Sequence, residues 1–265
     1  MIPGIAIDEW SEQAPWHDSE QVEQDLILSR ALVELFSNQL LQEQLIFRGG
    51  TALHKLVLNK VKRYSEDIDF VQKQSGPIGP VLTTIRKILE PWLGKSTWKL
   101  SRGRATVYYK FNSEIPPIQK MKVKIEINTR EHFQYFNISN ITHRVDNKWF
   151  QGEALIPTYS IEELLATKFR ALYQRKKGRD LFDLFIASQE LPNLNFSKVI
   201  ECFQYYMEKE GRVISRAEFK RNLIEKLKDN LFLDDIKPLL SAEQNYDPKE
   251  AYQEVLNKYI ILLPE

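Results

Sequence analysis

Two aspartates separated by one residue, Asp67 and Asp69, are the side chains of this sequence best spaced to bind a metal ion. The segment Asp67–Val71 alternates polar and apolar residues, which predicts a short strand. Alternate side chains of a strand point to the same side, so both carboxylates project together while Ile68 and Phe70 face the core. Neighbouring carboxylates repel each other unless a cation lies between them, and Mg²⁺ prefers carboxylates together with phosphate oxygens. The Asp-x-Asp pattern alone is more typical of solvated acids in a turn at a strand end.

The motif Gly49-Gly50-Thr51 precedes the first aspartate by sixteen residues. It lies between Leu45–Phe47, which predicts a buried strand, and a predicted helix over residues 51–58. Two glycines let the backbone approach a ligand, and a helix N-terminus offers N–H groups to a phosphate, to which the Thr51 hydroxyl can add a bond. Together, the glycine motif and the two aspartates predict a site for a metal and a nucleoside triphosphate.

A third carboxylate, Glu126, lies in Lys122–Asn128, where polar and apolar residues alternate strictly. This period of two predicts a half-buried strand on which Glu126 faces away from the core with Lys124. A third carboxylate on a neighbouring strand would complete a two-metal site. The alternative is an exposed glutamate in a lysine-rich strand.

Further along the chain, residues 168–184 carry a run of basic side chains that could hold a triphosphate or an RNA backbone. A continuous helix would place three of them on one face: Lys168, Arg175 and Arg179. Asp180 and Asp183 could orient these cations, although Gly178 is a candidate helix break. The alternative is a solvated basic helix with ion pairs such as Arg179–Asp183.

The elements that must position these residues form two predicted regions. Residues 1–156 read as an α+β lobe with a mixed sheet and flanking helices, and residues 157–265 as an all-helical lobe. The capping box Ser160–Glu163 predicts a helix start near the boundary. Other predicted elements are a helix over 20–42 capped by Asp18 or Ser19, a helix over 79–92, and a hairpin pairing 98–100 with 106–111.

Composition indicates a globular protein. Among 265 residues, 43% are hydrophobic and 28% are charged, which excludes disordered and fibrous classes. No apolar run approaches the length of a membrane span, no signal peptide is evident, and a single cysteine fits a reducing compartment, so a cytoplasmic location is expected. The net charge of +1 conceals an acidic N-terminus and a basic stretch over residues 95–148. Such a stretch attracts polyanions such as RNA, or consists simply of solvated strand lysines.

Several longer strings carry a family resemblance. The glycine motif and Asp67-x-Asp69 match the first signature of DNA polymerase β-like nucleotidyltransferases. The strings FRGGTALHKL, RYSEDIDF, KIEIN and ELLATKFRALYQRKKGRDLFDL resemble, in order and spacing, the AbiEii/AbiGii-type nucleotidyltransferase toxins of bacterial abortive-infection toxin–antitoxin systems. The resemblance covers about residues 20–190. It implies a bilobed, Mg²⁺-dependent enzyme that uses a nucleoside triphosphate, with tRNA as acceptor and a cognate antitoxin as a possible partner.

The resemblance also implies roles for individual residues. Asp67, Asp69 and Glu126 are expected to bind metal, and Glu126 stands where many members have aspartate, which lengthens its reach by one methylene. The expected catalytic residues are Asp67, Asp69, Glu126, Lys168, Asp180 and Asp183. The expected nucleotide-binding residues are Gly49, Gly50, Thr51, Lys55, Ser65, Arg175 and Arg179. Other classes stay open: modification of a small molecule, AMP transfer to a protein, or a nucleotide-binding module without activity.

Overall fold

The chain divides into two compact units in a computed structural model that describes residues 2–58, 62–241 and 244–265. We call them unit 1 and unit 2. Unit 1 consists of Met1–Leu56, Tyr64–Gln134 and Ile138–Tyr159. Unit 2 consists of Val57–Arg63, Tyr135–Asn137 and Ser160–Glu265. Neither unit is one continuous stretch of sequence, because two short segments from within the first 159 residues belong to unit 2.

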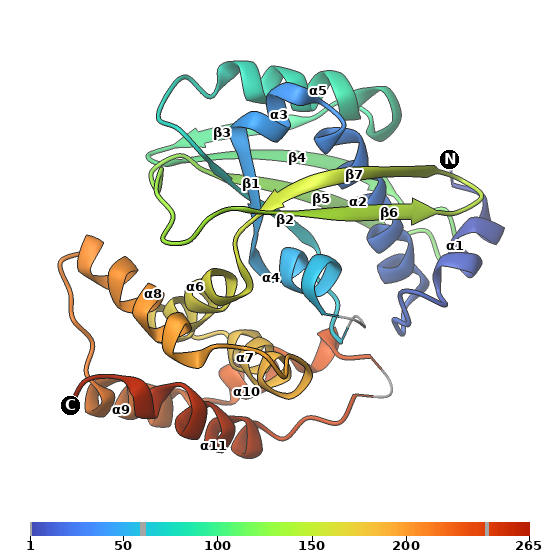
Figure 1. Ribbon diagram of the computed structural model, residues 1–265. Coiled ribbons are helices and arrows are strands. Elements are labelled where there is room, and N and C mark those ends of the chain that lie inside the picture. The colour runs from blue at the N-terminus through green and yellow to red at the C-terminus, as the bar shows by residue number, and fades with distance from the viewer. Residues whose placement is uncertain (1, 59–61, 242–243) are drawn as a thin grey trace. The chain divides into compact units, whose positions relative to one another are not determined.

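Unit 1 is built on a seven-stranded mixed sheet with the strand order β3-β4-β5-β2-β1-β7-β6 (Figure 1). The pairs β2–β5 and β1–β7 are parallel, and the other pairs are antiparallel. This arrangement confirms the predicted α+β lobe with a mixed sheet. The strands are β1 (Leu45–Arg48), β2 (Asp67–Gln72), β3 (Thr97–Ser101), β4 (Arg104–Asn112), β5 (Lys120–Asn128), β6 (Ser139–Asp146) and β7 (Gln151–Thr158).

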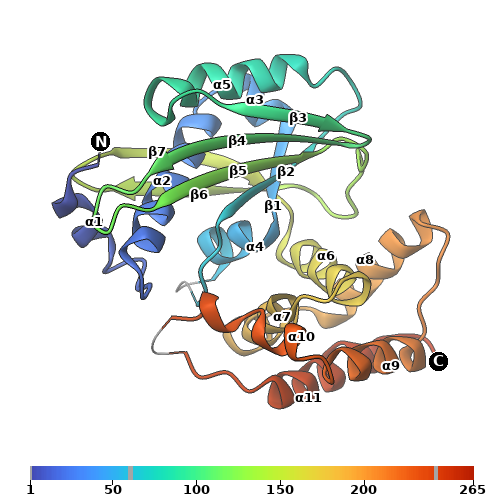
Figure 2. The same cartoon turned by 180° about the vertical axis from the view of Figure 1, so that it is seen from behind.

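Helices of unit 1 pack against this sheet, and Figure 2 shows the arrangement from behind. The ring of Phe70 lies 5.5 Å from that of Phe36 and 5.8 Å from that of Phe47, so an aromatic cluster joins α2 to the central strands. The helices are α1 (Gly4–Trp10), α2 (Ser19–Phe36), α3 (Gln39–Gln44), α4 (Gly49–Ala52), a π-helix (Leu53–Val57) and α5 (Gly79–Leu93).

The helix predicted over residues 20–42 is two helices. It ends at Phe36, and α3 begins after Asn38, whose side chain accepts a hydrogen bond from Leu41 N at 3.3 Å. This N-cap stabilises a new helix start, so the chain forms two helices although the apolar pattern continues. The hairpin of β6 and β7 was not predicted, because half-exposed side chains leave β6 without a clear apolar face.

Unit 2 is helical throughout its long C-terminal stretch, as predicted. Its core contains Phe169, which stacks on Phe219 with ring centroids 4.1 Å apart. No helix among the described residues combines the length and apolar character that crossing a bilayer requires. The helices are α6 (Ile161–Gln174), α7 (Gly178–Glu190), α8 (Phe196–Lys209), α9 (Arg216–Lys226), α10 (Asn230–Asp234) and α11 (Pro248–Lys258), with 3-10 turns at Lys237–Leu239 and Ile260–Leu262.

The cap at Asn38 gives a first testable prediction. Replacing Asn38 with alanine removes the acceptor for Leu41 N and is expected to lower the free energy of unfolding by about 1 kcal/mol. Asn38→Asp keeps the acceptor and should stay within ~0.5 kcal/mol of the wild type. Urea unfolding followed by circular dichroism measures both changes. Equal stability of Asn38→Ala and the wild type would contradict the assignment of the cap.

Candidate active site

Two rows of side chains cross the central strands of unit 1 on the face opposite the Phe36–Phe47–Phe70 cluster. They follow from the strand register, since residues directly opposite each other in paired strands share a face. The first row holds Arg48, Asp69, Glu126 and Thr106, and the second holds Asp67, Lys124 and Tyr108. Three carboxylates from two strands are therefore neighbours, with Lys124 and Arg48 among them.

The Asp69 side chain lies against the backbone of Gly49. Gly49 adopts a φ of +85°, a left-handed conformation that favours glycine. A Cβ on Gly49 would lie 2.5 Å from Oδ2 and 3.1 Å from Cβ of Asp69. The glycine at the start of α4 is therefore required both by its own conformation and by the carboxylate beside it.

The surroundings of the Asp69 carboxyl group disfavour its charged form. Burial raises its pKa, and the charges of Asp67 and Glu126 raise it further, while the Arg48 guanidinium works in the opposite direction. Lys124 offsets part of this repulsion from the neighbouring row. Its Nζ lies 2.8 Å from Asp67 Oδ2 and 3.7 Å from Glu126 Oε2. Glu126 is also paired with Arg104, whose Nε is 3.3 Å from Oε1.

Thr51 links the glycine motif to the aspartate strand. Its hydroxyl donates to the carbonyl oxygen of Asp67 at 2.5 Å and shares a 2.8 Å hydrogen bond with the Ser65 hydroxyl. The Thr51 side chain is buried, so its hydroxyl fixes the position of β2. The structure places Thr51 and Ser65 together, and the Thr51 hydroxyl, expected to contact phosphate, is hydrogen-bonded within the protein.

Lys55, expected to bind nucleotide, does not join these rows. Its Nζ lies 2.8 Å from Asp25 Oδ2 and 2.8 Å from Ser29 Oγ, and its side chain is buried. Asp25 also accepts a hydrogen bond from the indole of Trp10 at 2.9 Å. A buried carboxylate on α2 needs a cation, and Lys55 supplies it.

Among the described residues, no group of three or more His, Cys, Asp or Glu side chains is placed to hold a metal ion by itself. Mg²⁺, however, is commonly held by one or two carboxylates together with water and substrate phosphates. Asp67 and Asp69, two oxygen donors on one strand face, fit that requirement, and Glu126 lies opposite Asp69 on the paired strand.

A second cluster lies within unit 2. Asp183 is fully buried and accepts two hydrogen bonds from Arg63, at 2.7 and 2.8 Å. Lys168 Nζ lies 2.8 Å from Asp183 and 3.5 Å from Asp180, which is also fully buried. Both aspartates, expected to be catalytic, are buried and paired with cations of the protein. Arg63 is a residue of this cluster that sequence reasoning missed.

The basic residues beyond Lys168 do not share one helix face, which corrects that prediction. Helix α6 ends at Gln174 and α7 begins at Gly178, so the chain leaves the helix just before this glycine. Arg175 lies between the helices and binds Asp180 through two hydrogen bonds of 2.7 and 2.9 Å. Arg179 Nε lies 3.6 Å from Asp235.

The capping box at the start of α6 is half confirmed. The Ser160 hydroxyl accepts a hydrogen bond from Glu163 N at 3.3 Å, as predicted. The Glu163 carboxylate instead accepts from the backbone N–H groups of Tyr135 and Phe136, at 2.8 and 3.0 Å, and from the Tyr206 hydroxyl at 2.7 Å. A buried acid thus holds the segment Tyr135–Asn137 on unit 2.

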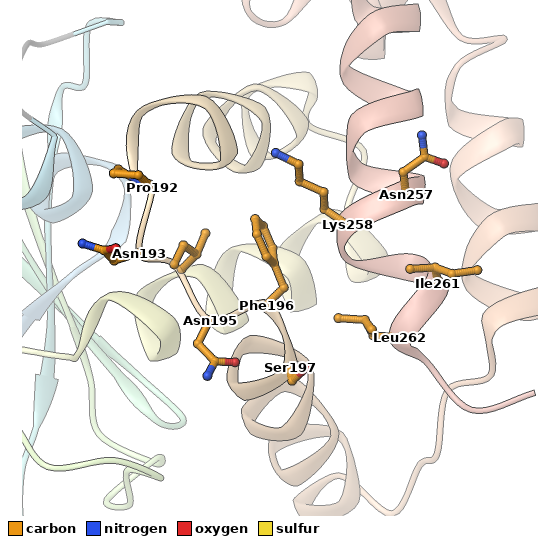
Figure 3. Close-up of a pocket in the computed structure, with 10 residues that line it drawn as sticks. Pro192, Asn193, Asn195, Phe196, Ser197, Asn257, Lys258, Ile261 and Leu262 are labelled. Atoms are coloured by element: carbon orange, nitrogen blue, oxygen red, sulfur yellow. The ribbon is translucent and has the colours of Figure 1, made fainter.

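A cavity of about 550 Å³ in unit 2 contains none of these residues (Figure 3). It lies between the loop after α7 and the chain beyond α11. Lys258, which lines it, pairs with Glu254 at 2.7 Å and lies 5.5 Å from the ring centre of Phe196. The cavity therefore offers no constellation for nucleotidyl transfer. Its lining residues are Pro192, Asn193, Leu194, Asn195, Phe196, Ser197, Asn257, Lys258, Ile261 and Leu262.

A family model described as "Nucleotidyl transferase AbiEii toxin, Type IV TA system" matches residues 30–258. The chain belongs to the AbiEii nucleotidyltransferase toxin family. The match includes both carboxylate rows and the Lys168 cluster, and it extends well beyond the residues on which the sequence resemblance rested.

Solved structures share the fold of this AbiEii family member at low sequence identity. MenT4, a nucleotidyltransferase toxin from Mycobacterium tuberculosis, aligns with a TM-score of 0.61 and 14% identity over 98% of this chain and 90% of its own. JHP933 from Helicobacter pylori aligns with a TM-score of 0.59 and 18% identity over 92% of each chain. A search of curated proteins finds no matching relative.

Family membership establishes the class of reaction. The protein is a nucleotidyltransferase and a toxin of the type IV toxin–antitoxin class, so its substrate is a nucleoside triphosphate and an antitoxin is its partner. Enzymes of this kind generally use a divalent metal.

The raised pKa of Asp69 gives a second testable prediction. The pKa of this carboxyl group is higher in the folded chain than its ordinary value of 3.8. The folded state therefore becomes less stable relative to the unfolded state as the pH rises above 3.8. Asp69→Asn removes this penalty, so its melting temperature should exceed that of the wild type at pH 7, and the difference should shrink towards pH 4. Asp67→Asn loses the ion pair with Lys124 and should show no such gain.

Calorimetry between pH 4 and pH 7 measures all three proteins. A lower melting temperature for Asp69→Asn than for Asp67→Asn at pH 7 would contradict this account of the site.

Proposed function

We propose that this enzyme transfers nucleotides from a nucleoside triphosphate to the 3′ end of tRNA in the cytoplasm, with Mg²⁺ bound by Asp67, Asp69 and Glu126. The observation that carries the proposal is the meeting of these carboxylates in adjacent rows, beside a glycine that leaves room for Asp69. Three acids kept together at an electrostatic cost indicate a site selected for cation binding rather than for stability.

Bound Mg²⁺ would neutralise the phosphates and lower the pKa of the attacking hydroxyl. The residues of the chain prepare that chemistry. Thr51 and Ser65 fix the start of β2, so Asp67 and Asp69 are held before substrate arrives. Arg48 is opposite Asp69 in the register and adds positive charge at the Gly49-Gly50 turn, where we place the triphosphate.

Lys168 and Arg175 are proposed to bind substrate phosphates, with Asp180 and Asp183 orienting them. The Arg175 side chain is half exposed although both of its hydrogen bonds to Asp180 are formed, which supports this role. Arg179, paired with Asp235, is proposed to assist from the first turn of α7.

The acceptor is proposed to bind along β4 and β5. Lys110 and Lys122 lie directly opposite each other, on the same face as the carboxylates, and both are exposed. Among the described residues, neither forms an ion pair within the protein. Two like charges directly opposite destabilise a sheet unless an anion joins them, and an RNA phosphate is such an anion. This arrangement favours RNA over a small neutral acceptor.

Incubation with each labelled nucleoside triphosphate and total cellular RNA tests the proposal, with products separated on a gel. Label in the tRNA band supports it. Label in protein instead would favour AMP transfer, and label in neither fraction would favour a small-molecule acceptor.

The third prediction concerns the aspartates in the same assay. Asp67→Ala and Asp69→Ala should each reduce transfer at least about 1,000-fold, because the loss of electrostatic stabilisation of the transition state is costly. Expression of the wild type should arrest growth, whereas Asp69→Ala should not. Retained transfer in either variant would exclude this site, and equal growth of wild type and Asp69→Ala would count against toxicity through transfer.

The fourth prediction concerns the opposed lysines. Lys110→Ala combined with Lys122→Ala should leave nucleotide affinity unchanged, weaken tRNA binding, and reduce its salt slope by up to ~2. Lys220→Ala with Lys249→Ala removes two exposed lysines of unit 2 and serves as the matched control. Calorimetry with nucleotide and filter binding with tRNA measure the effects. Equal salt slopes for both double variants would place the acceptor elsewhere.

A further inference from the structure

Lys124 differs from the other lysines on this face of the sheet. Its Nζ lies 2.8 Å from Asp67 Oδ2 and 3.7 Å from Glu126 Oε2, and its side chain is 24% exposed. Lys122, two residues earlier on the same strand and face, is exposed and has no ion pair among the described residues. Of these two lysines, Lys124 is the one positioned between acids.

We propose that Lys124 occupies the cation position of the free enzyme and that the divalent metal must displace its ammonium group from Asp67. This inference rests on the proposed function, since it assigns the metal to the same carboxylates. A carboxylate oxygen already bound to an ammonium group is a poor metal ligand, because the two cations would repel each other at close range. Metal binding therefore competes with an ion pair built into the strand.

The displaced ammonium group has a defined use. Lysine carries its charge on a flexible four-carbon stem, so Lys124 can turn from Asp67 to a nearby phosphate without movement of β5. With a metal–triphosphate complex bound, the phosphates would replace the Asp67 carboxylate as the partner of Lys124. The ion pair thus makes metal alone bind weakly and the metal–nucleotide complex bind well.

Mn²⁺ binding to the full chain, measured by electron paramagnetic resonance, tests this competition. Without nucleotide, Lys124→Met should bind Mn²⁺ about tenfold more tightly than the wild type, because the competing cation is gone. Lys122→Met removes one positive charge two residues away and should change Mn²⁺ affinity less than about twofold. Methionine keeps much of the lysine stem, and Lys124→Gln provides a second variant should the first fail to fold.

A second titration uses the Mn²⁺ complex of a triphosphate analogue with a non-cleavable α–β bridge. Lys124→Met should bind this complex no more tightly than the wild type, since the variant has lost the contact with phosphate. A gain in Mn²⁺ affinity that is absent from Lys124→Met, or equally large in Lys122→Met, overturns the inference. If the wild type binds neither Mn²⁺ nor the complex through Asp67 and Asp69, as judged by Asp67→Asn and Asp69→Asn, the proposed metal site falls and the inference falls with it.

Discussion

Unit 1 holds the carboxylates of Asp67, Asp69 and Glu126 close together, and their mutual repulsion constrains the residues around them. The parallel pairing of β2 with β5 brings Asp69 opposite Glu126, and Asp67 adds a third carboxylate on the same face. Left alone, such a group would favour a different register or protonation. The surrounding residues counter the repulsion: Lys124 and Arg104 pair with the acids, and Gly49 leaves space for Asp69. Much of the local sequence around the site therefore serves to keep three acids together.

The strands and the direction of their side chains could be predicted because both follow from a period of two. Asp67, Asp69 and Glu126 face away from the core as their alternation with buried isoleucine and phenylalanine indicated. The pairing of β2 with β5 could not be predicted from periodicity, since a register depends on the whole sheet. Lys55 shows the same limit: its motif suggested a phosphate contact, but its partner Asp25 lies thirty residues away on α2.

In unit 2, partners distant in sequence determine where the charged side chains of residues 168–184 lie. The spacing of Lys168, Arg175 and Arg179 assumed a continuous helix, and the break before Gly178 separates them. The acids Asp180 and Asp183 look solvent-accessible in sequence, because charged residues rarely occur fully buried. Their burial is possible only because cations lie around them, and one of these, Arg63, is 120 residues from its partner. No local signal could have revealed that pair.

The order in which the ribosome delivers these segments has a consequence for the newly made chain. Unit 1 is complete once residue 159 has emerged, whereas unit 2 joins Val57–Arg63 and Tyr135–Asn137 to the last 106 residues. Asp183 and Glu163 belong to that last stretch, and their partners Arg63 and Tyr135 are synthesised before them. A fragment that begins at Ser160 would bury both carboxylates without those partners, at a cost of several kcal/mol. A chain interrupted near its middle therefore carries all three acids proposed to bind metal but no finished helical unit.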